Sequence, residues 1–208
     1  DPLWSRGLGD VYKRQAIALH LGNGASMAAI AGGQSVDTSM GMTPLAGLMM
    51  GTRSGDLDPG VVLYLLAQGK TPSELDRLLN RDSGLKGIAR SNDMRDVLAR
   101  AAEGHEDARL ALDMYGYRIR QYIGAYLAVL GRVDALIFTG GIGEHAAPIR
   151  QKILENMDHL GICLNTQANQ SAKPGITDIQ TANSPIKILI IPTDEELEIA
   201  EQTGKLVG

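Results

Sequence analysis

A glycine-rich turn between two apolar stretches is the first candidate for chemistry. Residues 20–26 read HLGNGAS, which places Gly22, Asn23 and Gly24 at the turn. Glycines allow backbone N–H groups to approach phosphate oxygens closely, and the side chains of His20, Asn23 and Ser26 add hydrogen-bond donors. The pattern is typical of a phosphate-binding loop, with an ordinary tight hairpin turn as an equal alternative.

Arg53 stands among small residues just before a predicted helix. Residues 50–60 read MGTRSGDLDPG. A guanidinium in such a loop can bind the oxygens of a phosphoryl group during transfer, and the helix N-terminus behind it also favours anions. The alternative is an ion pair between Arg53 and Asp56 or Asp58, which is the commoner environment of an arginine.

A third candidate is the glycine-rich segment at residues 138–146, FTGGIGEHA, which follows an apolar strand. Nucleotides bind where the carboxyl ends of strands meet the N-termini of helices, so this segment is a candidate nucleotide site. The spacing of Gly141, Gly143 and Ala146 also fits the dinucleotide fingerprint. That fingerprint needs an acidic residue about 20 positions later. The apolar run there ends in Asn165, which argues against an NAD-dependent dehydrogenase.

The fourth candidate is acidic and follows the last predicted strand, where residues 193–196 read TDEE. Carboxylates at such a junction can hold Mg²⁺ directly or through water, as nucleotide enzymes require. The alternative is that these acids only complement the dipole of the helix that they begin.

Alternating strands and helices must position these four segments. Strands are predicted over residues 16–20, 26–31, 34–38, 135–138 and 187–191, with Gly32 and Gly33 turning a hairpin. Helices are predicted over residues 59–68, 71–80, 93–102, 106–130 and 148–160, and from Thr193 or Asp194 onward. The helix starts rest on Asp58 followed by Pro59, and on a capping box of Thr71 and Glu74. Residues 83–92 are expected to form a loop. The alternation indicates a layered α/β domain with a mixed sheet.

Composition narrows the class of protein. The 208 residues carry a net charge of −4, which offers no basic field for a polyanion and excludes a general nucleic-acid surface. The single cysteine, Cys163, cannot form an internal disulfide. The sequence shows neither a secretory apolar region nor a run of about 18 apolar residues, so we expect a cytoplasmic protein that does not span a membrane.

Residues 1–15 show neither helical nor strand periodicity and change abruptly into an apolar run. We interpret residues 1–15 as a non-native or artefactual leader. The folded domain is therefore expected to span residues 16–208.

Five motifs, taken in order, resemble the acetokinase family, which includes acetate, propionate and butyrate kinases. They are HLGNGAS (20–26), DTSMGMTPLAGLMMGTRSGDLDPG (37–60), SNDMRD (91–96), IFTGGIGE (137–144) and IPTDEELEIA (191–200). The resemblance covers residues 16–208 and corresponds to the C-terminal half of such an enzyme. It implies the C-terminal domain of the actin, sugar-kinase and chaperone superfamily, with a ribonuclease H-like ATPase core.

The resemblance also implies an activity. Members of the family transfer the γ-phosphoryl group of ATP reversibly to a short carboxylate such as acetate, giving an acyl phosphate and ADP, with Mg²⁺. The family dimerises through this domain, so a non-catalytic module for nucleotide binding and dimerisation is the alternative. Further active-site groups belong to the N-terminal half of the family, and residues 1–15 match none of their motifs. We therefore expect the chain not to complete the active site alone.

Site residues follow from the resemblance, position by position. Arg53 matches the arginine that stabilises the transferring phosphoryl group, His20 matches the histidine that hydrogen-bonds it, and Pro44 belongs to the pocket for the acyl methyl group. The nucleotide-binding positions are His20, Gly22, Asn23, Gly24, Asp93, Met94, Arg95, Gly140, Gly141, Ile142 and His145. Glu195 matches the Mg²⁺ carboxylate. The chain departs from the family pattern at Met94, His145 and Asp194, where an aromatic residue, asparagine and asparagine are usual.

Overall fold

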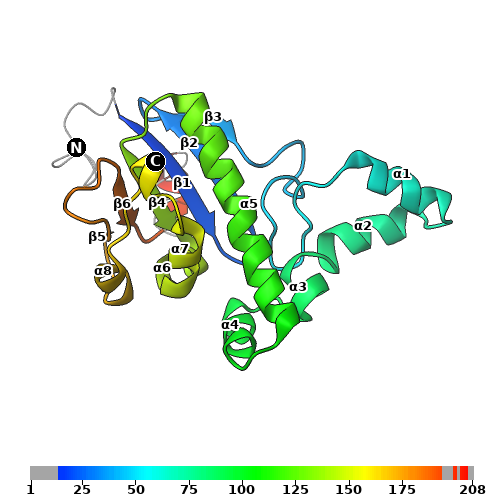
Figure 1. Ribbon diagram of the computed structural model, residues 1–208. Coiled ribbons are helices and arrows are strands. Elements are labelled where there is room, and N and C mark those ends of the chain that lie inside the picture. The colour runs from blue at the N-terminus through cyan, green and yellow to red at the C-terminus, as the bar shows by residue number, and fades with distance from the viewer. Residues whose placement is uncertain (1–13, 194–198, 201, 206–208) are drawn as a thin grey trace.

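Figure 1 shows the computed structural model, which describes residues 14–193, 199–200 and 202–205. The start of the predicted terminal helix, with Asp194 and Glu195, lies outside the described residues. Among the residues described, no helix combines the length and the apolar character needed to cross a membrane.

A six-stranded mixed sheet forms the centre of the fold, in the order β3-β2-β1-β4-β6-β5. The strands are β1 (Gln15–Leu21), β2 (Ala25–Ala31), β3 (Gln34–Thr38), β4 (Ala135–Thr139), β5 (Thr177–Asp178) and β6 (Lys187–Ile190). Strands β1, β4 and β6 run parallel, whereas β2, β3 and β5 pair antiparallel with their neighbours. This confirms the predicted mixed sheet. The short strand β5 was not predicted.

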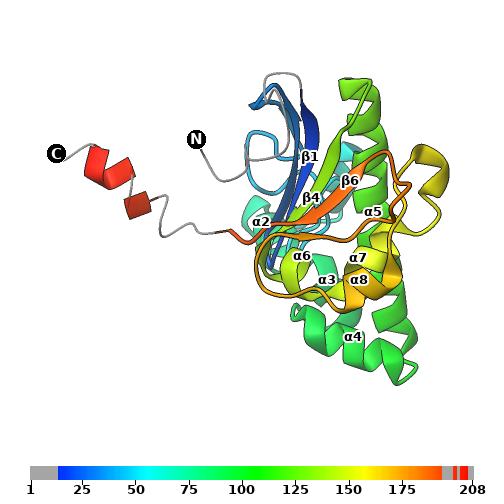
Figure 2. The same cartoon turned by 90° about the vertical axis from the view of Figure 1, so that its left-hand side faces the viewer.

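The sheet buries one face more deeply than the other. Along β1, Ile17, Leu19 and Leu21 are fully buried, and the residues between them are half-buried. Successive side chains of a strand point to opposite faces, so His20 lies on the less buried face. The long helix α5 (Glu106–Leu130) packs against β1 and β2, as Figures 1 and 2 show.

Helix α5 is the central packing helix, as its periodicity predicts. It ends at Gly131, whose φ of 70° is accessible to glycine. Its buried positions are Ala108, Ala111, Leu112, Tyr115, Gly116, Ile119, Ile123 and Tyr126. Met114 of the same helix is exposed.

Helices α1 (Pro59–Ala67) and α2 (Pro72–Arg81) form an arm that projects away from the sheet in Figure 1. Local capping explains both starts. The Asp58 carboxylate accepts a hydrogen bond from the Gly60 N–H, and Thr71 and Glu74 form the predicted reciprocal capping box. Helix α4 (Met94–Ala102) likewise begins after a side-chain cap, Asp93, which accepts from the Arg95 N–H.

The prediction of a loop over residues 83–92 is wrong, because helix α3 (Gly84–Ala89) lies within it. Contacts distant in sequence start this helix. The backbone N–H groups of Leu85 and Lys86 donate to the carbonyls of Met50 and Gly51, both at 2.9 Å. Ser83 stands at the N-cap but makes no side-chain hydrogen bond to the helix.

The predicted helix over residues 148–160 is interrupted. The chain forms α6 (Gly140–His145), α7 (Ala147–Leu154) and a separate 3₁₀ turn (Asp158–Leu160), which ends at Gly161 in the left-handed conformation. The break lies at Asn156, whose φ of 61° cannot continue a helix. A short helix α8 (Thr166–Gln170), also not predicted, packs against α7.

Candidate functional site

The carboxyl ends of the three parallel strands bring the candidate segments together. His20 of β1 pairs with Thr139 of β4, and Phe138 of β4 pairs with Ile190 of β6. The loops that follow these strands therefore leave from the same edge of the sheet. Ligands of open α/β sheets bind at such an edge. In Figure 2 the edge faces α4 and α6.

A cavity of about 600 Å³ lies between these loops and α4. The predicted nucleotide-binding residues that line it are Gly22, Asn23, Asp93, Met94, Arg95, Gly141, Ile142 and His145. The cavity thus gathers residues from three motifs that are far apart in the sequence. Four further lining residues were not among the predicted ones, namely Asn92, Leu98, Ala146 and Pro148.

Asn23 is held by residues that the sequence did not single out. Its side-chain oxygen accepts a hydrogen bond from Asn92 Nδ2 at 3.0 Å, and its carbonyl accepts one from the Gly51 N–H at 2.9 Å. A Cβ atom at Gly51 would lie 2.1 Å from Asn23 Oδ1, so glycine at this position lets the Asn23 side chain keep its place. Gly51 and Asn92 both lie within the motifs that resemble the acetokinase family. Their place in these motifs is the sequence signal that could have identified them.

Asp93 and Arg95 form a charged wall of the cavity. The Asp93 carboxylate caps α4 by accepting from the Arg95 N–H at 2.9 Å, and it also accepts from the Arg95 guanidinium at 2.6 and 3.0 Å. These hydrogen bonds lower the pKa of Asp93 to about 2. The carboxylate is therefore ionised at neutral pH and fixes the first turn of α4.

His20, Gly24 and Gly140 adjoin the cavity without lining it. Gly140 has a φ of +75°, and a Cβ atom there would lie 2.9 Å from the Leu21 carbonyl oxygen and 3.2 Å from His20 Cε1. Its N–H donates to Glu144 Oε1 at 3.0 Å, and the same oxygen accepts from the Thr193 N–H at 3.2 Å. Glu144 therefore links the start of α6 to the segment that follows β6.

Arg53 lies beside the phosphate-loop candidate. Its Nη1 would be 3.6 Å from a Cβ atom at Gly24, and it lies 3.5 Å from the Pro44 carbonyl oxygen and 3.7 Å from Met50 Sδ. Pro44 itself is exposed. Within the described part of the chain, Arg53 forms no ion pair.

The alternative reading of Arg53, an ion pair with Asp56 or Asp58, is wrong because both carboxylates have other partners. Asp56 accepts hydrogen bonds from the Tyr122 hydroxyl at 2.6 Å and from the Gly47 N–H at 2.7 Å. Asp58 caps α1. Where the chain is described, the Arg53 guanidinium therefore has no carboxylate partner, and its hydrogen-bond acceptors are the Pro44 carbonyl and Met50 Sδ.

Comparison with known proteins identifies the family of this chain. The sequence profile of the Acetokinase family matches residues 8–201. The chain belongs to the acetokinase family. It is 55% identical over 188 residues to the acetate kinase of Syntrophobacter fumaroxidans, covering 90% of this chain and 46% of that protein. The chain spans about half the length of the curated relatives it matches.

Solved structures of the acetokinase family share this fold. The crystal structure of Porphyromonas gingivalis acetate kinase superposes with a TM-score of 0.90 at 42% identity, covering 95% of this chain and 50% of that one. A propionate kinase from Francisella tularensis gives 0.86 at 44% identity, over 91% and 48%. The expected α/β domain, the C-terminal half of the ribonuclease H-like actin, sugar-kinase and chaperone fold, is confirmed. Family membership also sets aside the dehydrogenase interpretation.

The predicted metal ligand, Glu195, lies outside the described residues. Where the chain is described, no group of three or more His, Cys, Asp or Glu side chains is arranged to hold a metal ion. The described neighbour of that segment is Thr193, which Glu144 ties to the start of α6.

Proposed function

We propose that this chain is the nucleotide-binding part of an enzyme that transfers the γ-phosphoryl group of ATP reversibly to acetate, giving acetyl phosphate and ADP. Residues 16–208 form this part. The observation that carries the proposal is the cavity at the carboxyl edge of β1 and β4, which gathers Asn23, Asp93 and Gly141 beside Arg53, an arginine that has no carboxylate partner among the described residues. Phosphoryl transfer depends mostly on positioning and charge neutralisation, which such a site supplies.

Each group has a role in this proposal. ATP and ADP lie in the cavity, with adenosine against α4 at Asp93–Arg95 and against Gly141, Ile142 and His145 of α6. The phosphates approach the N–H groups of the loop at residues 22–24, with Gly140 at the start of α6 beside them. Arg53 and His20 donate to the transferring phosphoryl group, where hydrogen bonds from a fixed guanidinium stabilise the developing charge.

Mg²⁺ and the acyl group complete the proposed site. Glu195 supplies a carboxylate oxygen, the ligand type that Mg²⁺ prefers, and Mg²⁺ would neutralise phosphate charge during transfer. Glu144 supports this placement, because it holds Thr193 near Gly140. Pro44 contributes to the pocket for the acyl methyl group. Acetate is our first choice of acceptor. Propionate or butyrate is the alternative, and a propionate kinase is among the structures of similar fold.

Isothermal titration of ATP and of ADP, each with Mg²⁺, into the purified chain tests the nucleotide site. Gly141 lines the cavity, has open space around its Cα and needs no left-handed backbone, so Gly141→Trp should fill the cavity without unfolding the chain. Gly124→Trp is the matched control, because Gly124 is an exposed helical glycine with equally open surroundings that does not line the cavity.

We expect saturable binding that Gly141→Trp abolishes and Gly124→Trp leaves unchanged. An acyl phosphate assay on the same samples should show no turnover by this chain alone. A folded wild-type chain that binds neither nucleotide would contradict the nucleotide site. Turnover by the chain alone would contradict its catalytic incompleteness.

We infer a second, compatible role in which two copies of the chain associate through α1. This helix is largely apolar but has no buried residue. Its exposed apolar residues are Val61, Leu63, Tyr64 and Leu66, with Leu63 68% and Tyr64 63% exposed. An apolar helix face that no other element covers is typical of an association surface.

Sedimentation of the chain tests this association. The wild type should sediment as a dimer, and Leu63→Asp should shift it toward the monomer, because a carboxylate would have to be desolvated at the interface. Leu110→Asp is the control, since Leu110 is an exposed leucine on a different helix. A wild-type chain that is monomeric at high concentration would rule this role out.

A further inference from the structure

A second cavity, of about 830 Å³, borders Arg53 and shares no lining residue with the nucleotide cavity. Its charged lining side chains are Arg53, Asp76, Arg81 and Lys86. Three of these four are cationic, although the chain as a whole carries a net charge of −4. The surplus of positive charge is therefore local to this cavity.

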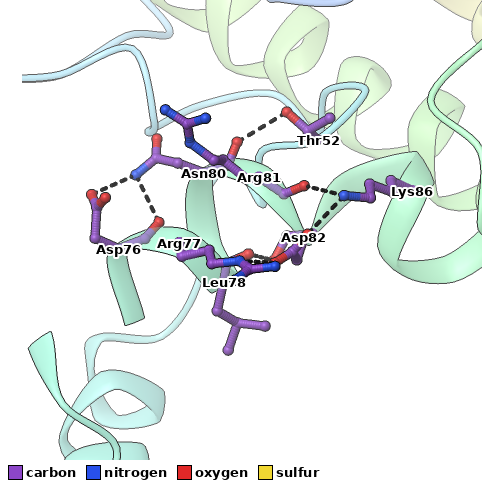
Figure 3. A network of polar contacts seen from close by, with 9 residues as sticks. Thr52, Asp76, Arg77, Leu78, Asn80, Arg81, Asp82 and Lys86 are labelled. Atoms are coloured by element: carbon purple, nitrogen blue, oxygen red, sulfur yellow. Dashed lines mark hydrogen bonds and ion pairs between the residues drawn. The ribbon is translucent and has the colours of Figure 1, made fainter. Parts of the chain in front are cut away.

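Hydrogen bonds and ion pairs already occupy two of the charged groups (Figure 3). Lys86 Nζ binds Asp82 Oδ1 at 2.7 Å and the Arg81 carbonyl oxygen at 3.0 Å. Asp76 Oδ1 accepts a hydrogen bond from Asn80 Nδ2 at 3.0 Å. Within the part of the chain that the structure describes, the two guanidinium groups of Arg53 and Arg81 have no carboxylate partner.

The two arginines of α2 differ in their ion pairing. Arg77, one turn earlier on the same helix, forms an ion pair with Asp82 at 3.0 Å and does not line the cavity. In Figure 3 the Arg81 guanidinium points away from the ion pairs around Asp82. Asp82 thus pairs with Arg77 and Lys86, and Arg81 has no ion-pair partner among the residues that the structure describes.

Backbone contacts hold the loop that carries Arg53 against the end of α2. The Thr52 hydroxyl donates to the Asn80 carbonyl at 2.9 Å, and the Ser83 N–H donates to the Thr52 carbonyl at 3.0 Å. The Ser54 N–H donates to the Leu79 carbonyl at 3.0 Å. Both arginines therefore extend from one hydrogen-bonded framework, and binding an anion needs little reorganisation of the backbone.

We propose that Arg81 extends the anion-binding position of Arg53 into a subsite for a small oxyanion, a phosphate or carboxylate group, in a cavity that shares no lining residue with the nucleotide cavity. A planar guanidinium binds either group through two parallel hydrogen bonds. The inference rests on the proposed function, because there the two anions correspond to the phosphoryl and carboxylate ends of the acyl substrate. Arg81 is the outer cation that captures this anion next to Arg53.

Titration of the 208-residue chain with inorganic phosphate, and separately with acetate, tests the subsite at low ionic strength, where charge interactions are least screened. Amide chemical shifts in NMR spectra report the binding. The test variant is Arg81→Gln and the matched control is Arg77→Gln, which removes the same charge from the same helix but from outside the cavity. Among the described residues the Arg81 side chain has no hydrogen-bond or ion-pair partner to lose, and far-UV circular dichroism verifies the fold of each variant.

We expect saturable binding of at least one anion, weakened about tenfold by Arg81→Gln, the effect of losing one charge-assisted contact. Arg77→Gln should bind as the wild type does. Phosphate binding alone would identify a phosphoryl subsite, and acetate binding alone a carboxylate subsite. The inference is overturned if the wild type binds neither anion, or if both variants weaken binding equally.

A parallel ATP titration separates this inference from the proposed function. Arg81→Gln should bind ATP as the wild type does, because Arg81 does not line the nucleotide cavity. If ATP fails to bind while anion binding depends on Arg81, the nucleotide site is refuted and the subsite stands. The reverse pattern refutes the subsite alone.

Discussion

Arg150 donates a hydrogen bond from Nε to Asn169 Oδ1 at 2.7 Å, and both residues are 1% exposed. The remaining guanidinium nitrogens donate to the carbonyls of Gly143 at 2.8 Å, Glu144 at 2.9 Å and Asn169 at 3.1 Å. Burial without a described carboxylate partner lowers the pKa of Arg150 to about 10. The cation therefore ties the end of α6, which borders the nucleotide cavity, to α8.

Arg150→Ala should destabilise the chain by about 3 kcal/mol, because it leaves several buried carbonyl and amide groups without partners. Urea denaturation measures the change, and Arg150→Lys should have an intermediate effect. Arg77→Ala removes an exposed ion pair and should cost less than about 1 kcal/mol. Equal losses for Arg150→Ala and Arg77→Ala would show that the buried network contributes nothing beyond a surface charge.

Gly84 is the position where α3 meets the loop that carries Arg53. A Cβ atom there would lie 2.1 Å from the Met50 carbonyl oxygen, and the φ of Gly84 is +63°. Gly84→Ala should therefore cost more than about 3 kcal/mol through combined strain and overlap. Gly69→Ala should cost about 1 kcal/mol, because Gly69 has a φ of +89° but open space around it. Thermal unfolding of both variants separates overlap from backbone strain, and similar melting temperatures would contradict the overlap.

Asp93 should stabilise the chain in a pH-dependent way. Its pKa is about 2 in the folded chain and 3.8 in the reference state, so its contribution is present above about pH 4 and is lost as the pH falls toward 2. Asp93→Asn keeps a helix-capping oxygen but removes the charge that binds Arg95. The wild type should be the more stable at pH 7, and the difference should shrink below pH 4.

Urea denaturation at several pH values between 3 and 7 measures this difference. In an Arg95→Gln background, Asp93→Asn should have a smaller effect, because the two residues interact with each other. An Asp93→Asn effect that is independent of both pH and Arg95 would exclude the ion pair as its source.

Gly51 should matter for nucleotide binding more than for stability. A Cβ atom at Gly51 would meet the side chain of Asn23, which can rotate away but would then leave its hydrogen bond to Asn92. Gly51→Ala should therefore weaken ATP binding several-fold in calorimetric titration. Gly41→Ala is the control, because its new Cβ atom would make only an ordinary 3.4 Å contact with Ala46. If Gly51→Ala leaves the ATP affinity unchanged, Asn23 does not contribute to ATP binding.

Sequence by itself determined the elements whose signals are local. Asp58, Thr71 and Asp93 start their helices as predicted, because each cap bonds to an N–H group only two or three residues away. The resemblance of ordered motifs also anticipated which segments would line the nucleotide cavity, although not the contribution of Asn92.

Tertiary structure decided what depends on distant partners. Helix α3 forms where a loop was predicted because carbonyls of Met50 and Gly51 receive its first N–H groups. Within the described residues Arg53 has no carboxylate partner, because the hydroxyl of Tyr122, 66 positions from Asp56 in the chain, donates to the Asp56 carboxylate. Pairing between groups so far apart follows from packing, which no local spacing encodes.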